Sequence, residues 1–90
     1  GAWFCVLTPE GTELSSEGLA ERLQAEKLNG RSAACFLIGS SFGIDARIKR
    51  MADFRLSFSK MTFPHHLMRV MALEQLYRAE SILAGTKYHK

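Results

Sequence analysis

The sequence predicts an α/β domain in which a parallel sheet carries helices on both faces. Two short apolar runs, at 3–7 and 34–38, and a third predicted strand at 54–58 alternate with three segments of helical pattern. Continuous apolar runs are typical of strands covered on both faces, and strand–helix alternation is typical of a parallel sheet. At 90 residues and 47% hydrophobic content, the chain is long enough for one small domain.

The first strand run is followed by a Pro-Glu-Gly break at 9–11. Ser15 is placed to cap the first helix, which carries Leu19 and Leu23 on its inward face. Asn-Gly at 29–30 is a typical helix end. We therefore expect one helix between the first two strands.

The second strand run ends in a Gly-Ser-Ser-Phe-Gly loop that begins at Gly39. Asp45 is placed to cap a short helix that runs to about residue 52, before the third strand run. Thr62 is a plausible cap for the last helix, and Pro64 suits its first turn. We expect that helix to run to about residue 83 and to stop at Gly85.

The last helix is apolar around much of its circumference, more than one sheet face can cover. A second copy of the chain in a symmetric dimer is the simplest partner. The alternative is a helix that leaves a few apolar side chains in water.

The two cysteines, Cys5 and Cys35, both lie in apolar strand runs. We expect both to be buried free thiols, with a disulfide or a reactive thiol as the alternative. Their spacing does not suit zinc or a redox pair, and this use of cysteine favours the cytoplasm. No apolar run approaches the roughly 20 residues that cross a bilayer, so no membrane is expected.

Charge is unevenly placed along the chain. Residues 1–30 carry a net charge of −3 and residues 31–90 a net charge of +6. The basic excess indicates a phosphate-rich partner such as RNA. A solvated surface of mixed charge is the alternative, because there is no polybasic run.

Three loops follow the predicted strands, after Leu7, at Gly39 and at 58–63. Parallel strands present the same end, so these loops are expected to meet at the sheet edge where ligands bind. The Gly39 loop matches neither a dinucleotide fingerprint nor a P-loop, and a tight turn is its simplest reading. The histidines do not assemble into a ligand set, so no metal is expected.

The chain ends on Tyr88, His89 and Lys90, just past the predicted end of the last helix. Such an ending is normally a frayed tail. Placed over a ligand site, it would offer stacking, proton transfer and a phosphate contact.

Several motifs together carry a resemblance to a known family. They are Leu-Ser-Phe-Ser-Lys-Met-Thr-Phe-Pro-His at 56–65, Glu-Gln-Leu-Tyr-Arg-Ala at 74–79, Ile-Gly at 38–39 and the terminal Tyr-His at 88–89. In these the chain resembles the RlmH (YbeA-type) ribosomal RNA large-subunit methyltransferases of the SPOUT class. The match covers essentially the whole chain.

The resemblance implies a domain with a trefoil knot and a homodimer formed through the knot region. It also implies S-adenosyl-L-methionine as cofactor and methylation of a pseudouridine, at ring N3, in the large-subunit ribosomal RNA of the assembled ribosome. Residues 1–90 would then be the methyltransferase domain without the family's N-terminal strands, which would leave a sheet edge unprotected.

Carried over by position, the resemblance implies a role for each of several residues. The candidates to assist catalysis are His65, Tyr88 and His89, and those for RNA phosphates are Arg69, Arg78 and Lys90. The implied cofactor-binding residues are Leu7, Gly39, Phe58, Ser59, Lys60, Met61, Thr62 and Phe63.

Three positions depart from the family's pattern. Thr8 stands where an acid is usual, Ser40 where a second glycine is usual, and His66 where glutamine is common. Two other hypotheses remain at this point: a non-catalytic RNA- or ribosome-binding module, and a fragment that only dimerises. Salt-dependent RNA affinity that is unaffected by cofactor would mark the RNA-binding module.

Overall fold

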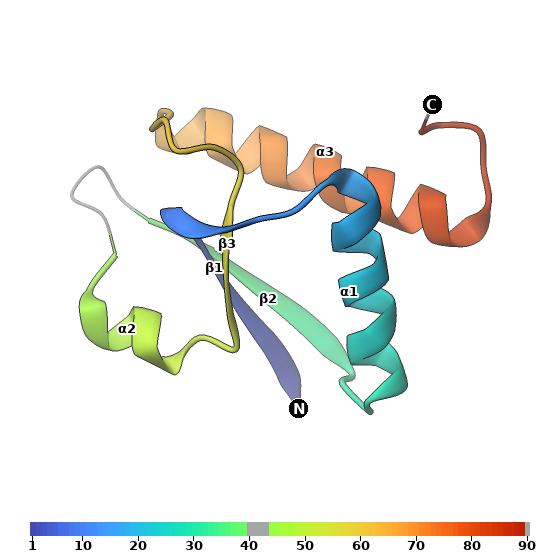
Figure 1. The fold of residues 1–90 in the computed structure, drawn as a ribbon, viewed down its shortest axis with the longest axis horizontal. Coiled ribbons are helices and arrows are strands. Elements are labelled where there is room, and N and C mark those ends of the chain that lie inside the picture. The colour runs from blue at the N-terminus through green and yellow to red at the C-terminus, as the bar shows by residue number, and fades with distance from the viewer. Residues whose placement is uncertain (40–43, 90) are drawn as a thin grey trace.

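The computed structural model describes residues 1–39 and 44–89 and confirms the predicted parallel α/β fold. The sheet has the strand order β2-β1-β3, with both strand pairs parallel. Figure 1 shows α1 to one side of the strands and α2 to the other. The elements are β1 (Ala2–Glu13), α1 (Ser16–Leu28), β2 (Ala33–Ile38), α2 (Ala46–Met51), β3 (Phe54–Ser57) and α3 (His65–Ala84).

Two of the predicted helix caps are confirmed. The Ser15 hydroxyl accepts a hydrogen bond from the Gly18 N–H at 2.9 Å. The Asp45 carboxylate accepts one from the Arg47 N–H at 2.7 Å. Each cap satisfies a backbone donor that the first helical turn leaves without a partner.

The predicted cap of the last helix is wrong. Pro64 is the N-cap of α3 and makes no side-chain cap hydrogen bond, so Thr62 lies two residues too early for that role. Proline disfavours helical backbone at Phe63, and Pro64 itself is extended with ψ 147°, so it precedes the first helical turn instead of lying in it as predicted. The other end follows the prediction, because Gly85 adopts the left-handed conformation with φ 75°.

An aromatic cluster joins the three strands. Trp3 of β1 is 1% exposed and lies edge-on to Phe36 of β2 and stacked on Phe54 of β3, with ring centroids 5.9 Å apart in both pairs. The apolar face of α1, with Leu19 and Leu23 buried, packs into the same core. The cluster therefore holds both neighbours of the central strand in register.

The Pro-Glu-Gly segment does not end β1, contrary to the prediction. The strand continues to Glu13, and Leu7 and Thr12 both pair with Leu56 of β3. The segment 8–11 therefore bulges out of the sheet between those two pairings, as extra residues do in a β-bulge. A Cβ atom on Gly11 would lie 2.7 Å from the Arg55 carbonyl oxygen, so only glycine fits this approach of two backbones.

The prediction that β2 is buried on both faces is wrong for its first half. Ala33 to Cys35 are exposed, because in the described residues β2 pairs only with β1 and α2 buries no side chain. Cys35 is therefore an exposed thiol, whereas Cys5 in the central strand is fully buried. Burial raises the pKa of the Cys5 thiol to about 12.

Among the described helices, none combines the length and the apolar character that a membrane crossing requires. The trefoil knot stays a prediction.

Thiol reactivity should separate the two cysteines. In the native protein at mildly alkaline pH, a thiol-specific chromogenic reagent should modify Cys35 rapidly and leave Cys5 unmodified, because only a thiolate that meets solvent reacts. In denaturant both should react. Rapid modification of the native Cys35→Ser variant would contradict the burial of Cys5.

Gly11→Ala should destabilise the fold by roughly 1–3 kcal/mol, since the new methyl group must displace the β3 backbone. Chemical denaturation measures this free energy of unfolding. Gly1→Ala is the matched control, because its added Cβ meets nothing within 4 Å. Equal stability of the two variants would show that the bulge does not depend on glycine.

Candidate functional site

A cavity of about 520 Å³ lies at the carboxyl ends of β2 and β3 and beside the bulge of β1. Its size is that of a typical small-molecule site, and its position is where open parallel sheets bind ligands. The bulge of β1, the end of β2 and the loop between β3 and α3 each supply part of the wall. The lining residues are Leu7, Thr8, Pro9, Glu10, Ile38, Gly39, Ile44, Lys49, Phe58, Ser59, Met61, Thr62, Phe63, Pro64 and Met68.

The structure brings seven of the eight predicted cofactor residues together in this one wall. Only Lys60 is outside it, and its side chain is exposed. The rest of the predicted second loop, residues 40–43, lies outside the described residues. The seven residues that line the cavity are Leu7, Gly39, Phe58, Ser59, Met61, Thr62 and Phe63.

A buried hydroxyl joins two of the cavity's loops. Ser57, the last residue of β3, is 2% exposed, and its Oγ lies 3.0 Å from the Pro9 carbonyl oxygen and 2.9 Å from that of Ser59. One hydroxyl proton serves both acceptors. The hydroxyl of Ser59 in turn accepts a hydrogen bond from the Met61 N–H at 3.1 Å. The bulge and the β3–α3 loop are therefore held at a fixed spacing.

Sequence reasoning missed the polar side of the cavity. Glu10 on the bulge forms an ion pair with Lys49 of α2, and both side chains line the wall beside Thr8. The Lys49 ammonium, and then the Thr8 hydroxyl, lower the pKa of the Glu10 carboxyl to about 2. Local patterns could not find this pair because it joins elements 39 residues apart.

His65 and Arg69 lie close to the cavity in the chain. His65 is the first residue of α3 and directly follows Pro64 in the cavity wall, and its side chain is exposed. Arg69 lies one turn further along α3 and is also exposed. Both are therefore accessible to a large substrate that approaches the cavity mouth.

Tyr88 and His89 fold back along α3 onto Glu74, Tyr77 and Arg78 near its middle, and His89 also contacts Glu17 of α1. These three residues of α3 lie nine to thirteen positions after His65, which is about 14–20 Å of helix. The tail is docked there: the Tyr88 hydroxyl donates to Glu74 at 2.9 Å, and the Tyr88 ring lies 4.7 Å from that of Tyr77. The tail of one chain is thus held away from the His65 end of α3.

His89 completes this docking through both ring nitrogens. Nδ1 lies 3.0 Å from an Arg78 nitrogen, and Nε2 lies 2.8 Å from a Glu17 carboxylate oxygen. Because arginine only donates, Nδ1 accepts from Arg78 and Nε2–H donates to Glu17. The contact lowers the pKa of Glu17, and the Glu74 carboxylate raises the pKa of Tyr88.

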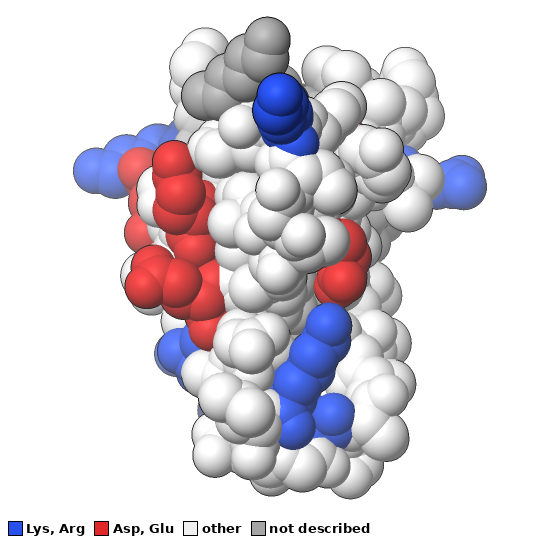
Figure 2. Space-filling view, turned by 90° about the vertical axis from the view of Figure 1, so that its right-hand side faces the viewer, with Lys and Arg blue, Asp and Glu red and all other residues white. Residues whose placement is uncertain are grey.

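The third predicted RNA contact, Lys90, lies outside the described residues, and Arg78 is already paired with Glu74 at 3.0 Å. The side of the molecule that faces the viewer in Figure 2 shows acidic and basic side chains gathered in separate groups, with no continuous basic patch. In residues 1–39 and 44–89, no three His, Cys, Asp or Glu side chains are grouped to hold a metal ion.

The fold and the cavity define a parallel α/β domain with a small-molecule site at the ends of its strands. A family model described as "Predicted SPOUT methyltransferase" matches residues 1–89, so the chain belongs to the SPOUT methyltransferase family.

Three similar proteins are each named "Ribosomal RNA large subunit methyltransferase H". The one from Bifidobacterium animalis subsp. lactis (strain AD011) is 53% identical over 90 residues, which are 100% of this chain and 57% of the relative. That from Bifidobacterium adolescentis is 52% identical over 89 residues, or 99% of this chain and 56% of the relative. That from Acetivibrio thermocellus is 48% identical over 90 residues, which are 100% of this chain and 57% of the relative. The chain thus spans somewhat more than half the length of these relatives.

Ser57→Ala should cost roughly 1–2 kcal/mol of stability, because the Pro9 and Ser59 carbonyl groups lose their shared donor. It should also raise amide hydrogen exchange in the bulge and in the β3–α3 loop, which denaturation alone would not reveal. Ser32→Ala, at an exposed serine, is the control. Unchanged exchange in both loops would contradict the role of Ser57 as their link.

Proposed function

We propose that this chain is the cofactor-binding part of an enzyme that uses S-adenosyl-L-methionine to methylate ribosomal RNA. The main observation is the cavity at the bulge of β1 and the ends of β2 and β3, which seven of the eight expected cofactor residues line. Family membership and three relatives named as ribosomal RNA methyltransferases support the same reaction. The proposed target is ring N3 of a pseudouridine in the large subunit of the assembled ribosome, which would place the reaction in the cytoplasm.

The cavity suits this cofactor in size and in chemistry. Its volume of about 520 Å³ falls within the usual range for nucleotide-sized ligands. Phe58, Phe63 and Met68 provide apolar surface of the kind that covers an adenine ring, while Thr8 and Thr62 offer hydroxyl groups. The cofactor, when bound, supplies an activated methyl group.

The chain's own residues then have to position the acceptor base and remove one proton from it. Positioning is the larger contribution in a transfer of this kind, so a rigid cavity matters. Within one chain, His65 is the candidate to receive the proton of the ring nitrogen, because it directly follows the cavity wall at Pro64. Arg69, one turn away, is the candidate for an RNA phosphate contact.

We further propose that the chain works as a homodimer. Leu67, Val70, Leu73 and Tyr77 are large apolar side chains exposed at three- or four-residue spacing along α3. The docked tail borders this stripe, since Tyr88 contacts Tyr77. Because Tyr88 and His89 are held on α3 about 14–20 Å of helix from His65, we propose that they assist the reaction in the site of a second copy.

The alternative is a module that binds RNA or only dimerises, without catalysis. The net charge of +6 in residues 31–90 favours RNA, and the exposed stripe on α3 favours dimerisation. Arg78 and Lys90 remain proposed RNA contacts in either case.

Calorimetric titration with S-adenosyl-L-methionine tests the proposal, after light scattering has established the mass of the sample. Wild-type protein should bind saturably, and Gly39→Val should abolish binding because a branched side chain enters the cavity wall. Ala33→Val is the control, since it adds the same side chain at the exposed, opposite end of β2. RNA affinity of both variants should stay near the wild-type value.

A folded dimer that binds RNA but does not bind the cofactor would overturn the methyltransferase proposal in favour of the RNA-binding module. A folded dimer that binds neither RNA nor the cofactor would leave dimerisation as the only one of the three hypotheses that still stands.

A further inference from the structure

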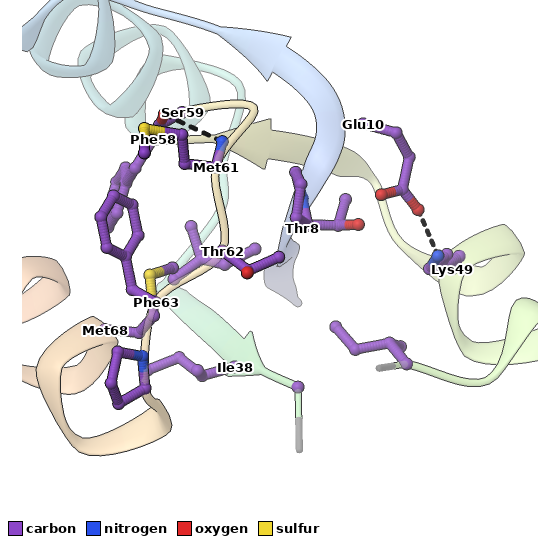
Figure 3. A pocket seen from close by; sticks show the side chains of 15 residues that line it. Thr8, Glu10, Ile38, Lys49, Phe58, Ser59, Met61, Thr62, Phe63 and Met68 are labelled. Atoms are coloured by element: carbon purple, nitrogen blue, oxygen red, sulfur yellow. Dashed lines mark hydrogen bonds and ion pairs between the residues drawn. The ribbon is translucent and has the colours of Figure 1, made fainter. Parts of the chain in front are cut away.

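The cavity has two chemically different walls (Figure 3). Phe58, Met61, Phe63 and Met68 gather on one side, and Glu10 and Lys49 face them from the other. The hydroxyl side chains of Thr8 and Thr62 lie between the two walls. A ligand that fills this space must therefore be apolar or flat at one end and charged at the other.

The charged wall is an ion pair between two separate elements. Glu10 projects from the bulge of β1, and Lys49 projects from α2. The Lys49 side chain is 27% exposed and the Glu10 side chain 58%, so both charged groups are accessible to a ligand. The low pKa of Glu10 keeps its carboxylate ionised at any neutral pH.

The pair leaves bonding capacity on both partners. It joins Lys49 Nζ to Glu10 Oε1, and an ammonium has three donors while a carboxylate has two acceptor oxygens. A ligand group that carries one positive and one negative charge can therefore bind to the pair, with its positive charge beside Glu10 and its negative charge beside Lys49. A lone phosphate would meet the Glu10 carboxylate as a like charge.

We propose that Glu10 and Lys49 bind the amino-acid end of the cofactor, Glu10 taking its ammonium group and Lys49 its carboxylate. This inference rests on the proposed function, and it assigns to these two residues the selection among adenosine derivatives. The apolar wall would accept any adenosine derivative, whereas the charged wall selects those that carry a zwitterionic amino acid.

Two ligands isolate this effect. S-adenosylhomocysteine carries the amino-acid end, and 5′-methylthioadenosine replaces it with a methyl group; neither has a sulfonium charge. Wild-type protein should bind S-adenosylhomocysteine at least about tenfold more tightly, the usual effect of charge-assisted hydrogen bonds. Lys49→Gln and Glu10→Gln should reduce that preference to about twofold or less, leaving methylthioadenosine affinity unchanged.

Arg50→Gln is the matched control, because it removes one positive charge from the same helix at a residue outside the cavity wall. It should keep the wild-type preference. Lys49→Arg should retain most of the preference, since the positive charge remains. Thermal denaturation of each variant shows that the fold is intact, as expected for an exposed ion pair.

The possible outcomes test this inference and the proposed function separately. If the wild type binds both ligands equally, or if Lys49→Gln weakens both to the same extent, the inference is overturned and the methyltransferase proposal stands. If Arg50→Gln lowers the preference as much as Lys49→Gln, general charge and not this pair is responsible, and the inference fails. If the folded wild type binds neither ligand, the proposed function fails and the inference with it.

Discussion

The double pairing of Leu56 is the constraint on which the site depends. Leu7 and Thr12 of the central strand both pair with this one residue of β3, so the segment between them has to leave the sheet. That segment carries Thr8 and Glu10 into the cavity wall. It can fold back only because Gly11 lets two backbones approach closely. The local break in the ladder is thus what gives the sheet edge a polar wall.

The sheet tolerates this break because its other end is strongly held. Trp3 contacts aromatic rings from both neighbouring strands, and α1 and α3 pack together over the core. At the cavity end, the Ser57 hydroxyl replaces the missing ladder bonds with a link between the bulge and the next loop. A rigid base and one buried hydroxyl together position loops that have few contacts of their own.

Local patterns predicted most of the fold, because strand runs, caps and glycine stops act over a few residues. Ser15, Asp45 and Gly85 behave as expected for that reason. Parallel topology also predicted that three loops would meet. The failures are contacts that depend on tertiary structure: the pair of Glu10 with a helix far along the chain, and the exposure of Cys35 on a strand paired on one side. The docking of the tail by Glu17 and Glu74 was likewise invisible to local patterns.

We propose that the bulge and the loops beside it form one binding site for an adenosine cofactor. Backbone amide chemical shifts, followed by NMR during titration with S-adenosylhomocysteine, test it residue by residue. The large changes in amide chemical shift should cluster at 8–11, at Gly39 and at 58–63, and the amides of α1 should remain unaffected. Saturable binding whose shifts fall instead on α1 and the docked tail would contradict it, because the ligand would then occupy a different site.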